Sequence, residues 1–293
     1  MRVFVTGATG WVGAAVVEEL LGGGHQVLGL ARSKEKGDRL AAGGAEVLLA
    51  TLDDLAALRG AAAAADAVVH LAFNHDFSRF AENAAQDRRA IEALGEALAG
   101  SDKPFLVTSG VALIAPGRVA VETDRPPRDA SFPRRSEVTA AALAERGVRA
   151  ATVRLAPSVH GVGETHGFVP MLMDLARRSG VSAYLGDGEN HWAAVHVSDA
   201  GRLYRLALES DVRQTVYHAT DEEGIAFRDI AEAIGRKLGL PVARRDREHF
   251  GWFADFASAD MQASNRLTRE ALGWQPTGPA LLADIADPGY YAG

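Results

Sequence analysis

Apolar residues in the first half of the chain form short runs that alternate with longer amphipathic stretches. We predict strands where aliphatic and β-branched residues run together, and helices where apolar residues recur every three or four positions. The predicted strands cover residues 3–5, 25–31, 45–50, 66–72, 104–108 and 150–155. A long helix is predicted over 78–99 and a shorter one over 136–146. This alternation predicts an α/β fold with a doubly wound parallel sheet.

The second half of the chain is less regular. Helical spacing covers 168–179 and 227–238, and further strands are predicted at 181–185 and 216–219. We therefore divide the chain into a first domain, 1–160, and a smaller lobe, 161–293, that lies over the carboxyl edge of the sheet. Residues 195–219 are predicted to return to the first domain.

Three glycines follow the first predicted strand. Gly7 permits a tight turn, Gly10 lets the backbone approach a pyrophosphate, and Gly13 lets the next helix pack closely on the strand. The N-terminus of that helix offers unpaired N–H groups to phosphates. This context predicts a dinucleotide cofactor in a Rossmann-type domain. From the same turn, Thr9, Trp11 and Val12 join the predicted cofactor-binding residues.

The second predicted strand ends in Arg32, Ser33 and Lys34, with no carboxylate before Glu35. An acidic residue at this position binds the ribose hydroxyls of NAD, whereas a cation accommodates the 2′-phosphate of NADP. We therefore favour NADP(H) over NAD(H), with Arg32 and Ser33 among the binding residues. In the alternative interpretation, Arg32 and Lys34 are solvated at a helix N-terminus, which is an unfavourable place for cations.

Residues after the other strands complete the predicted cofactor site, because ligands bind at the carboxyl edge of such sheets. They are Asp53, Leu71, Ala72, Phe73, Thr108, Pro157 and Val159. Two interpretations of Asp53 and Asp54 stay open. Asp53 either hydrogen-bonds the adenine amine or belongs with Asp54 to the start of a helix, where Asp54 is a candidate N-cap.

Candidate acids and bases lie at the same edge. His75 and Asp76 follow the fourth strand, and a histidine there can shuttle protons near neutral pH. A loop histidine is also often a surface or packing residue. Thr108 and Ser109 end the fifth strand, where their hydroxyls either contact cofactor and substrate or cap the turn.

Composition narrows the range of partners. The net charge of -7 disfavours nucleic acid and anionic membranes as partners. The chain has no cysteine, which excludes disulfides, thiolate catalysis and cysteine-bound zinc, and fits a reducing cytoplasm. The first strand leaves no room for a signal peptide, and no apolar run approaches a membrane span of ~20 residues. We expect a cytoplasmic protein that binds a small-molecule substrate and no metal.

Five sequence motifs together resemble the extended and atypical short-chain dehydrogenase/reductases, which include sugar-nucleotide epimerases and hydroxysteroid dehydrogenases. The motifs are TGATGWVG at 6–13, HLA at 70–72, RLAPSVHG at 154–161, VHVSDAG at 195–201 and LGWQP at 272–276. The resemblance covers nearly the whole chain. It implies a Rossmann-type fold and a bound NAD(P).

The family's catalytic residues are a Ser or Thr, a Tyr, and a Lys four residues after the Tyr. In this chain the resemblance places Gly110 at the Ser, Pro133 at the Tyr and Glu137 at the Lys. No tyrosine occurs before Tyr184, so the standard Tyr–Lys mechanism is excluded. Arg134 and its neighbour Arg135 lie beside the missing pair and are candidates for its positive charge.

We therefore expect a reductase of a small carbonyl, imine or conjugated enone with a non-standard proton donor. The candidate donors are His75, Asp76, Ser109, His160 and water. Many relatives have Tyr in place of His160, so this histidine is alternatively a packed aromatic. Loop aromatics of the second lobe are candidates to line an apolar substrate pocket; they are Trp192, Phe250, Trp252, Phe253 and Phe256.

Two other function classes stay open. One is a non-catalytic NADP(H)-binding redox sensor similar to the NmrA regulators, and the other is an isomerase or lyase that keeps the cofactor. By analogy with relatives, two copies of the chain are expected to pair through helices 78–99 and 136–146.

Overall fold

A large parallel sheet organises the first domain. The computed structural model describes residues 1–126, 134–210 and 212–291. The sheet has seven strands in the order β10-β6-β5-β4-β1-β2-β3, and its neighbours all pair in parallel. The strands are β1 (Arg2–Thr6), β2 (Gln26–Ala31), β3 (Glu46–Leu49), β4 (Ala67–His70), β5 (Phe105–Gly110), β6 (Ala150–Leu155) and β10 (Val216–Ala219). The predicted α/β fold with a doubly wound sheet is confirmed.

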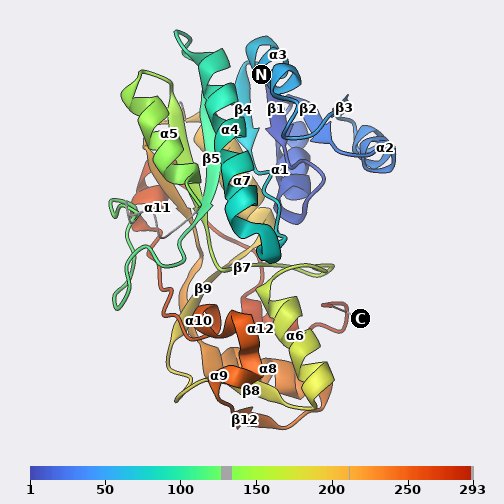
Figure 1. The fold of residues 1–293 in the computed structure, drawn as a ribbon, viewed down its shortest axis with the longest axis vertical. Helices are drawn as coiled ribbons and strands as arrows, with labels where there is room; N and C mark the ends of the chain where they lie inside the picture. The colour runs from blue at the N-terminus through green and yellow to red at the C-terminus, as the bar shows by residue number, and fades with distance from the viewer. Residues whose placement is uncertain (127–133, 211, 292–293) are drawn as a thin grey trace.

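Helices cover both faces of this sheet (Figure 1). They are α1 (Trp11–Gly22), α2 (Lys34–Ala42), α3 (Leu55–Ala64), α4 (Phe80–Leu98), α5 (Ser136–Glu145) and α7 (Val197–Glu209). Side chains of β5 alternate between the two faces. Leu106 packs in the core under α1 and α7, whereas Phe105 and Val107 pack under α3, α4 and α5.

The second lobe has its own core. It contains a three-stranded sheet, in the order β11-β9-β7, and a two-stranded sheet of β12 and β8. These strands are β7 (Ser158–His160), β8 (Ser182–Tyr184), β9 (His191–His196), β11 (Glu222–Ala226) and β12 (Val242–Arg244). Its helices are α6 (Phe168–Ser179), α8 (Phe227–Leu238), α9 (Arg247–Phe250), α10 (Ala254–Ala257) and α12 (Leu281–Ala286). Helix α11 (Arg266–Leu272) packs instead on β10 and α7 of the first domain. Single turns of 3-10 helix, η1 (Phe77–Arg79) and η2 (Gly251–Phe253), precede α4 and α10.

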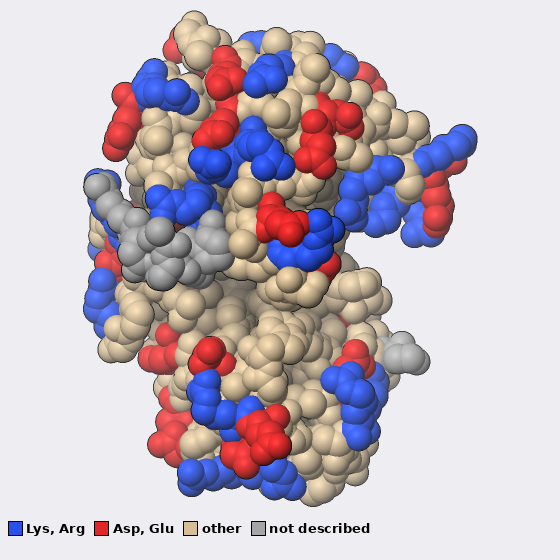
Figure 2. Space-filling model, in the orientation of Figure 1, with Lys and Arg blue, Asp and Glu red and all other residues tan. Residues whose placement is uncertain are grey.

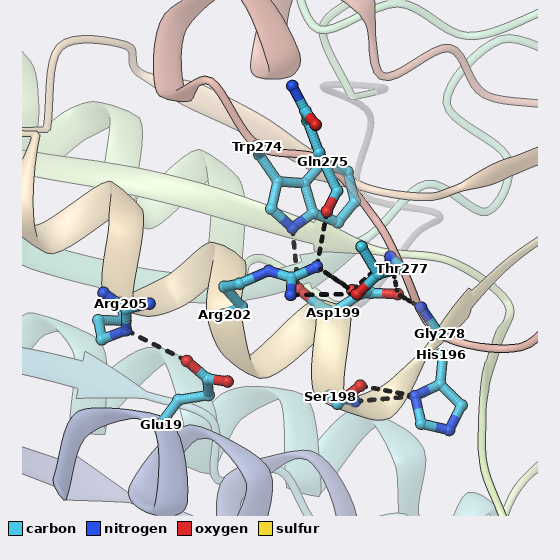
Figure 3. A network of polar contacts seen from close by, with 10 residues as sticks. All are labelled: Glu19, His196, Ser198, Asp199, Arg202, Arg205, Trp274, Gln275, Thr277 and Gly278. Atoms are coloured by element: carbon cyan, nitrogen blue, oxygen red, sulfur yellow. Dashed lines mark hydrogen bonds and ion pairs between the residues drawn. The ribbon is translucent and has the colours of Figure 1, made fainter. Parts of the chain in front are cut away.

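The segment that links the two lobes crosses back to the large sheet. Helix α7 packs on α1, where an added Cβ at Gly201 would lie 2.9 Å from the Ala15 backbone. The Asp199 carboxylate accepts hydrogen bonds from the backbone N–H groups of Thr277 and Gly278 (Figure 3). The backbone carbonyl of Asp199 accepts a hydrogen bond from the Trp274 indole. The motifs at 195–201 and 272–276 therefore hold each other in place.

Two expectations about the second lobe differ from the structure. Trp192 lies in β9 rather than in a loop, and Trp192, Phe250 and Phe253 are buried in the lobe's core. Of the five predicted pocket aromatics, Phe256 is half-buried and Trp252 is 65% exposed. The helices in the described part of the chain include none that is long and apolar enough to span a membrane.

Candidate functional site

The glycine turn after β1 leaves one open face. Gly7 has φ +70°, and a Cβ there would lie 2.7 Å from the Ala72 nitrogen. A Cβ on Gly13 would lie 1.9 Å from the Gly7 carbonyl oxygen, so α1 can approach β1 only with glycine at this position. An added Cβ on Gly10 meets only that same oxygen, at 3.3 Å. Gly7 and Gly13 thus pack the turn, while Gly10 leaves space for a ligand.

The start of α1 presents its backbone to this space. Gly10 is the N-cap and has no side chain with which to bond the first N–H groups of the helix. Those groups belong to Trp11 and Val12, beside the half-buried Thr9. The Trp11 indole donates to the Val159 carbonyl over 2.7 Å and so ties the turn to the segment after β6. This cradle fits the pyrophosphate of a dinucleotide.

Cations surround the N-terminus of α2. Ser33 caps this helix by accepting from the Lys36 nitrogen at 3.4 Å, and Lys34 pairs with Asp38 at 2.7 Å. Arg32 is exposed, and it has no hydrogen-bond or ion-pair partner within the described ranges. The end of β2 therefore carries a free guanidinium beside a helix N-terminus.

Asp53 and Asp54 both lie at the surface just before α3. Asp53 is exposed and accepts from Gln86 of α4 at 2.7 Å. Asp54 occupies the N-cap position of α3 but makes no capping bond; it accepts instead from the backbone nitrogen of Thr51 at 2.7 Å. The contact between Asp53 and adenine stays a prediction.

A buried chain of hydrogen bonds runs from β1 to the start of α5. His70 contacts Thr6 through Nδ1 at 2.8 Å and Asp87 of α4 through Nε2 at 3.1 Å. Ser136 donates to the other Asp87 oxygen over 2.6 Å, and Arg134 Nε donates to the Ser136 hydroxyl over 3.1 Å. His70, Asp87 and Ser136 are almost inaccessible. The pattern of the sequence gave no sign of Asp87, because an acidic residue on a helix is normally solvated.

Arg134 lies at the carboxyl edge of the sheet. Its guanidinium carbon is 4.3 Å from the centre of the Phe73 ring. A guanidinium N–H of Arg134 donates to the backbone carbonyl of Thr108 over 3.2 Å. Burial lowers the pKa of Arg134, while the Asp87 carboxylate raises it. Pro133, where the family has Tyr, falls outside the described residues.

The two hydroxyls at the end of β5 face opposite ways. Thr108 is hydrogen-bonded to the buried Tyr204 hydroxyl of α7 at 2.7 Å. Alternation along the strand turns Ser109 toward the α4 and α5 side, on which Ser136 and Arg134 also lie. Ser109 is half-buried, and the described residues provide no hydrogen-bond partner for its hydroxyl. Ser109 is therefore available to a ligand.

Glu137, which the resemblance places at the family's Lys position, is paired with Arg154 through both carboxylate oxygens. Arg154 donates to both of its carboxylate oxygens, at 2.5 and 2.8 Å. Arg154 is completely buried and also donates to His218 Nε2 over 3.0 Å. Gly110, which the resemblance places at the family's Ser position, ends β5 and has no side chain that could provide a hydroxyl. Glu137 thus forms a buried ion pair with Arg154.

His75 and Asp76 lie in the loop between β4 and η1. The exposed His75 ring packs edge-on to Phe73 at 5.3 Å, and its pKa is lowered by partial desolvation and by the nearby Arg134. Asp76 accepts from the Ser78 backbone nitrogen at 3.1 Å and from its hydroxyl at 2.6 Å. These bonds lower the pKa of Asp76 and so favour its ionised form. Asp76 therefore serves better as the N-cap of η1 than as a proton donor.

The His160 side chain contacts the second lobe. It is completely buried, and its Nδ1 lies 2.6 Å from the Asp284 carboxylate of α12. Its ring packs edge-on against His196 at 5.7 Å. This placement favours the packed alternative over the proton donor. Leu71, Ala72 and Pro157, in contrast, lie in the segments that directly follow β4 and β6, where the cofactor is predicted to bind.

Comparison with known proteins identifies the family. A family model, the NAD dependent epimerase/dehydratase family, matches residues 3–219. This chain belongs to that family. An uncharacterized protein of Schizosaccharomyces pombe is 44% identical over 99% of this chain and 100% of its own length. The 3-diazoavenalumate denitrifying reductase of a Streptomyces species is 29% identical over 96% of this chain and 97% of its own.

Solved structures support the same fold. The UDP-glucose 4-epimerase of Thermus thermophilus in complex with NAD superposes with a TM-score of 0.75 at 20% identity, over 98% of this chain and 97% of its own. The predicted resemblance to short-chain dehydrogenase/reductases is thereby confirmed. A nicotinamide cofactor and an oxidoreductase type of enzyme follow from the family, and the glycine cradle fits them.

Proposed function

We propose that this chain is an NADP(H)-dependent reductase of a small carbonyl, imine or conjugated enone. The observation that carries the proposal is the placement of Arg134, which rests on Phe73 and is held through Ser136 to the buried Asp87. A guanidinium fixed at the edge where the cofactor binds supplies the positive charge that the absent Lys would provide.

Each residue at this edge has a distinct role in the proposal. When bound, the reduced nicotinamide supplies a hydride. The Ser109 hydroxyl donates a hydrogen bond to the substrate oxygen or nitrogen, and Arg134 stabilises the negative charge that develops there. His75, which is exposed, passes a proton from solvent to that atom. Because its pKa is lowered, the rate of reduction should fall as pH rises through and above that pKa.

The test follows NADPH absorbance while purified protein is offered ketones, enones and imines. With the best substrate, Arg134→Met should lower kcat/KM by roughly 10²–10³-fold without changing the Kd for NADPH. Arg88→Met, on the exposed face of α4, removes the same charge and is the control. Tight NADPH binding with no turnover of any substrate would favour the redox sensor instead.

The preference for NADP(H) rests on Arg32 and on the N-terminus of α2. Arg32→Asp should reduce the affinity for NADPH relative to NADH by about ten- to a hundredfold, since a charge-assisted hydrogen bond is lost. Arg39→Asp changes the net charge equally at the far end of the same helix and serves as control. An unchanged ratio of the two Kd values would refute the preference.

The name of the Streptomyces relative, a reductase, supports this class over an isomerase or lyase. Two further points stay predictions: a cytoplasmic location, and a homodimer that forms through α4 and α5.

A further inference from the structure

We propose that the site selects a substrate whose reducible group is attached to, or conjugated with, an aromatic ring. The ring packs against a row of four aromatic side chains, Phe73, His75, Phe77 and Trp252, which we call the aromatic row. This inference rests on the proposed reductase function and adds the substrate class.

The aromatic row is continuous from the cofactor edge to the second lobe. Ring centres are 5.3 Å apart for Phe73 and His75, 6.2 Å for His75 and Phe77, and 5.1 Å for Phe77 and Trp252. These separations are those of interacting aromatic pairs. The guanidinium of Arg134 lies over the ring of Phe73, the first member of the row. The row therefore begins at the proposed reaction centre.

The row joins the two lobes. Phe77 precedes α4, and its ring centre is also 6.4 Å from that of Phe168 at the start of α6. Phe168 lies 4.1 Å from Phe256 of α10. Figure 1 shows the lower end of α4 above α6 and α10, in agreement with these contacts. Rings from both sides of the junction therefore form one apolar wall.

Trp252 is the member that the fold itself does not require. Its side chain is 65% exposed, the largest exposure among the large hydrophobic residues that the structure describes, whereas Trp192 and Trp274 are completely buried. The indole packs against Phe77 on one side and exposes much of its apolar surface to water. A bound ligand that covers this surface would gain hydrophobic free energy. An exposed tryptophan at the end of a row that starts at Arg134 points to a ligand contact.

Charge restricts the substrate further. Figure 2 shows a hollow between the two lobes whose walls are tan, with Lys, Arg, Asp and Glu side chains grouped above and below it. The cation Arg134 lies over the ring of Phe73, the first member of the aromatic row. The site therefore suits an uncharged aryl ketone or aryl enone with its oxygen toward Arg134, rather than a polyanionic substrate.

The experiment compares two enones of equal carbon skeleton, 4-phenyl-3-buten-2-one and 4-cyclohexyl-3-buten-2-one. Their binding to the protein loaded with NADP⁺ is measured by calorimetry, and their reduction by NADPH absorbance. The phenyl enone should bind about three- to tenfold more tightly, as expected for one additional aromatic pair. Trp252→Leu should reduce this difference and Trp252→Phe should keep it, while Leu49→Ala, on the distant edge strand β3, should leave both affinities unchanged.

The outcomes separate the two proposals. Tighter binding of the phenyl enone that depends on Trp252, without turnover, would support the aromatic row and contradict the reductase function. Turnover of both enones with equal kcat/KM and equal affinity would contradict the aromatic row alone. A phenyl preference of unchanged size in Trp252→Leu would also overturn this inference.

Discussion

Two buried glutamates, one in each lobe, show how the partner decides what a buried carboxyl does. Glu137 in the first domain is 7% exposed and Glu164 in the second lobe is 2% exposed. Glu137 accepts two hydrogen bonds from Arg154, whose guanidinium is always charged. Glu164 accepts one bond from the neutral Tyr290 hydroxyl at 2.5 Å, and no Lys or Arg in the described ranges pairs with it.

The difference shows in their chemistry. Burial raises the pKa of Glu164 from 4.5 to about 8, and the nearby Asp284 carboxylate adds to the rise. Glu164 is therefore largely a neutral acid at pH 7. The Glu137–Arg154 ion pair, in contrast, links α5 to β6. Similar burial thus yields an ion pair in one lobe and a titratable acid in the other.

Removing the cation from the first site should have the largest effect. Arg154→Leu leaves the Glu137 carboxylate buried without a partner and should lower the free energy of unfolding by about 3–5 kcal/mol. Urea denaturation measures this loss. In the double variant with Glu137→Leu much of the stability should return, and a double variant as unstable as Arg154→Leu would show that the loss is one of packing.

The second site should respond to pH. Between pH 4.5 and about 8 the unfolded chain has released the Glu164 proton while the folded chain retains it. Its contribution to stability is therefore full at low pH and declines as pH rises, by at most about 5 kcal/mol. Glu164→Gln keeps the shape and cannot ionise.

The measurement is the free energy of unfolding of both proteins at several pH values from 5 to 8.5. The stability of the original protein relative to Glu164→Gln should fall steadily with rising pH. Parallel curves would mean that Glu164 is ionised throughout, against the assignment of a neutral acid.

The sequence predicts well those features that depend on the backbone and on residues close together in the chain. The turn at Gly7, Gly10 and Gly13 follows from the spacing of residues that lack a Cβ, and the parallel sheet follows from alternation of strands and helices. The strands β7, β9 and β11 were not predicted as a sheet, because β7 is short and its partner β9 comes some thirty residues later.

Partners of buried side chains were not predictable. Arg134 was noticed beside the missing Tyr, but its support by Ser136 and Asp87 depends on α4 and α5 packing side by side. The aromatics of the second lobe could not be sorted into core and surface, since Trp252 and Phe253 are adjacent in the chain and differ fully in burial. Both failures concern contacts between residues distant in sequence.

Asp87 is another buried carboxylate, and its hydrogen bonds can be tested for their role in holding Arg134 in place. It is 2% exposed and is hydrogen-bonded to His70 and Ser136, and Ser136 in turn accepts a hydrogen bond from Arg134. Asp87→Asn keeps the volume of the side chain but removes its charge, so Arg134 should be held less firmly. We expect kcat to fall roughly tenfold, which corresponds to about 1.4 kcal/mol in the activation free energy. KM and the Kd for NADPH should stay unchanged.

Ser136→Ala, alone and combined with Asp87→Asn, supplies the control. Because the two residues act on Arg134 through one chain of bonds, the double variant should lose no more kcat than the worse single variant. Multiplied losses would mean that Asp87 and Ser136 act separately. An unchanged kcat in Asp87→Asn would confine this carboxylate to the fold, like Glu137, and would leave Arg134 positioned by Phe73 and the Thr108 carbonyl.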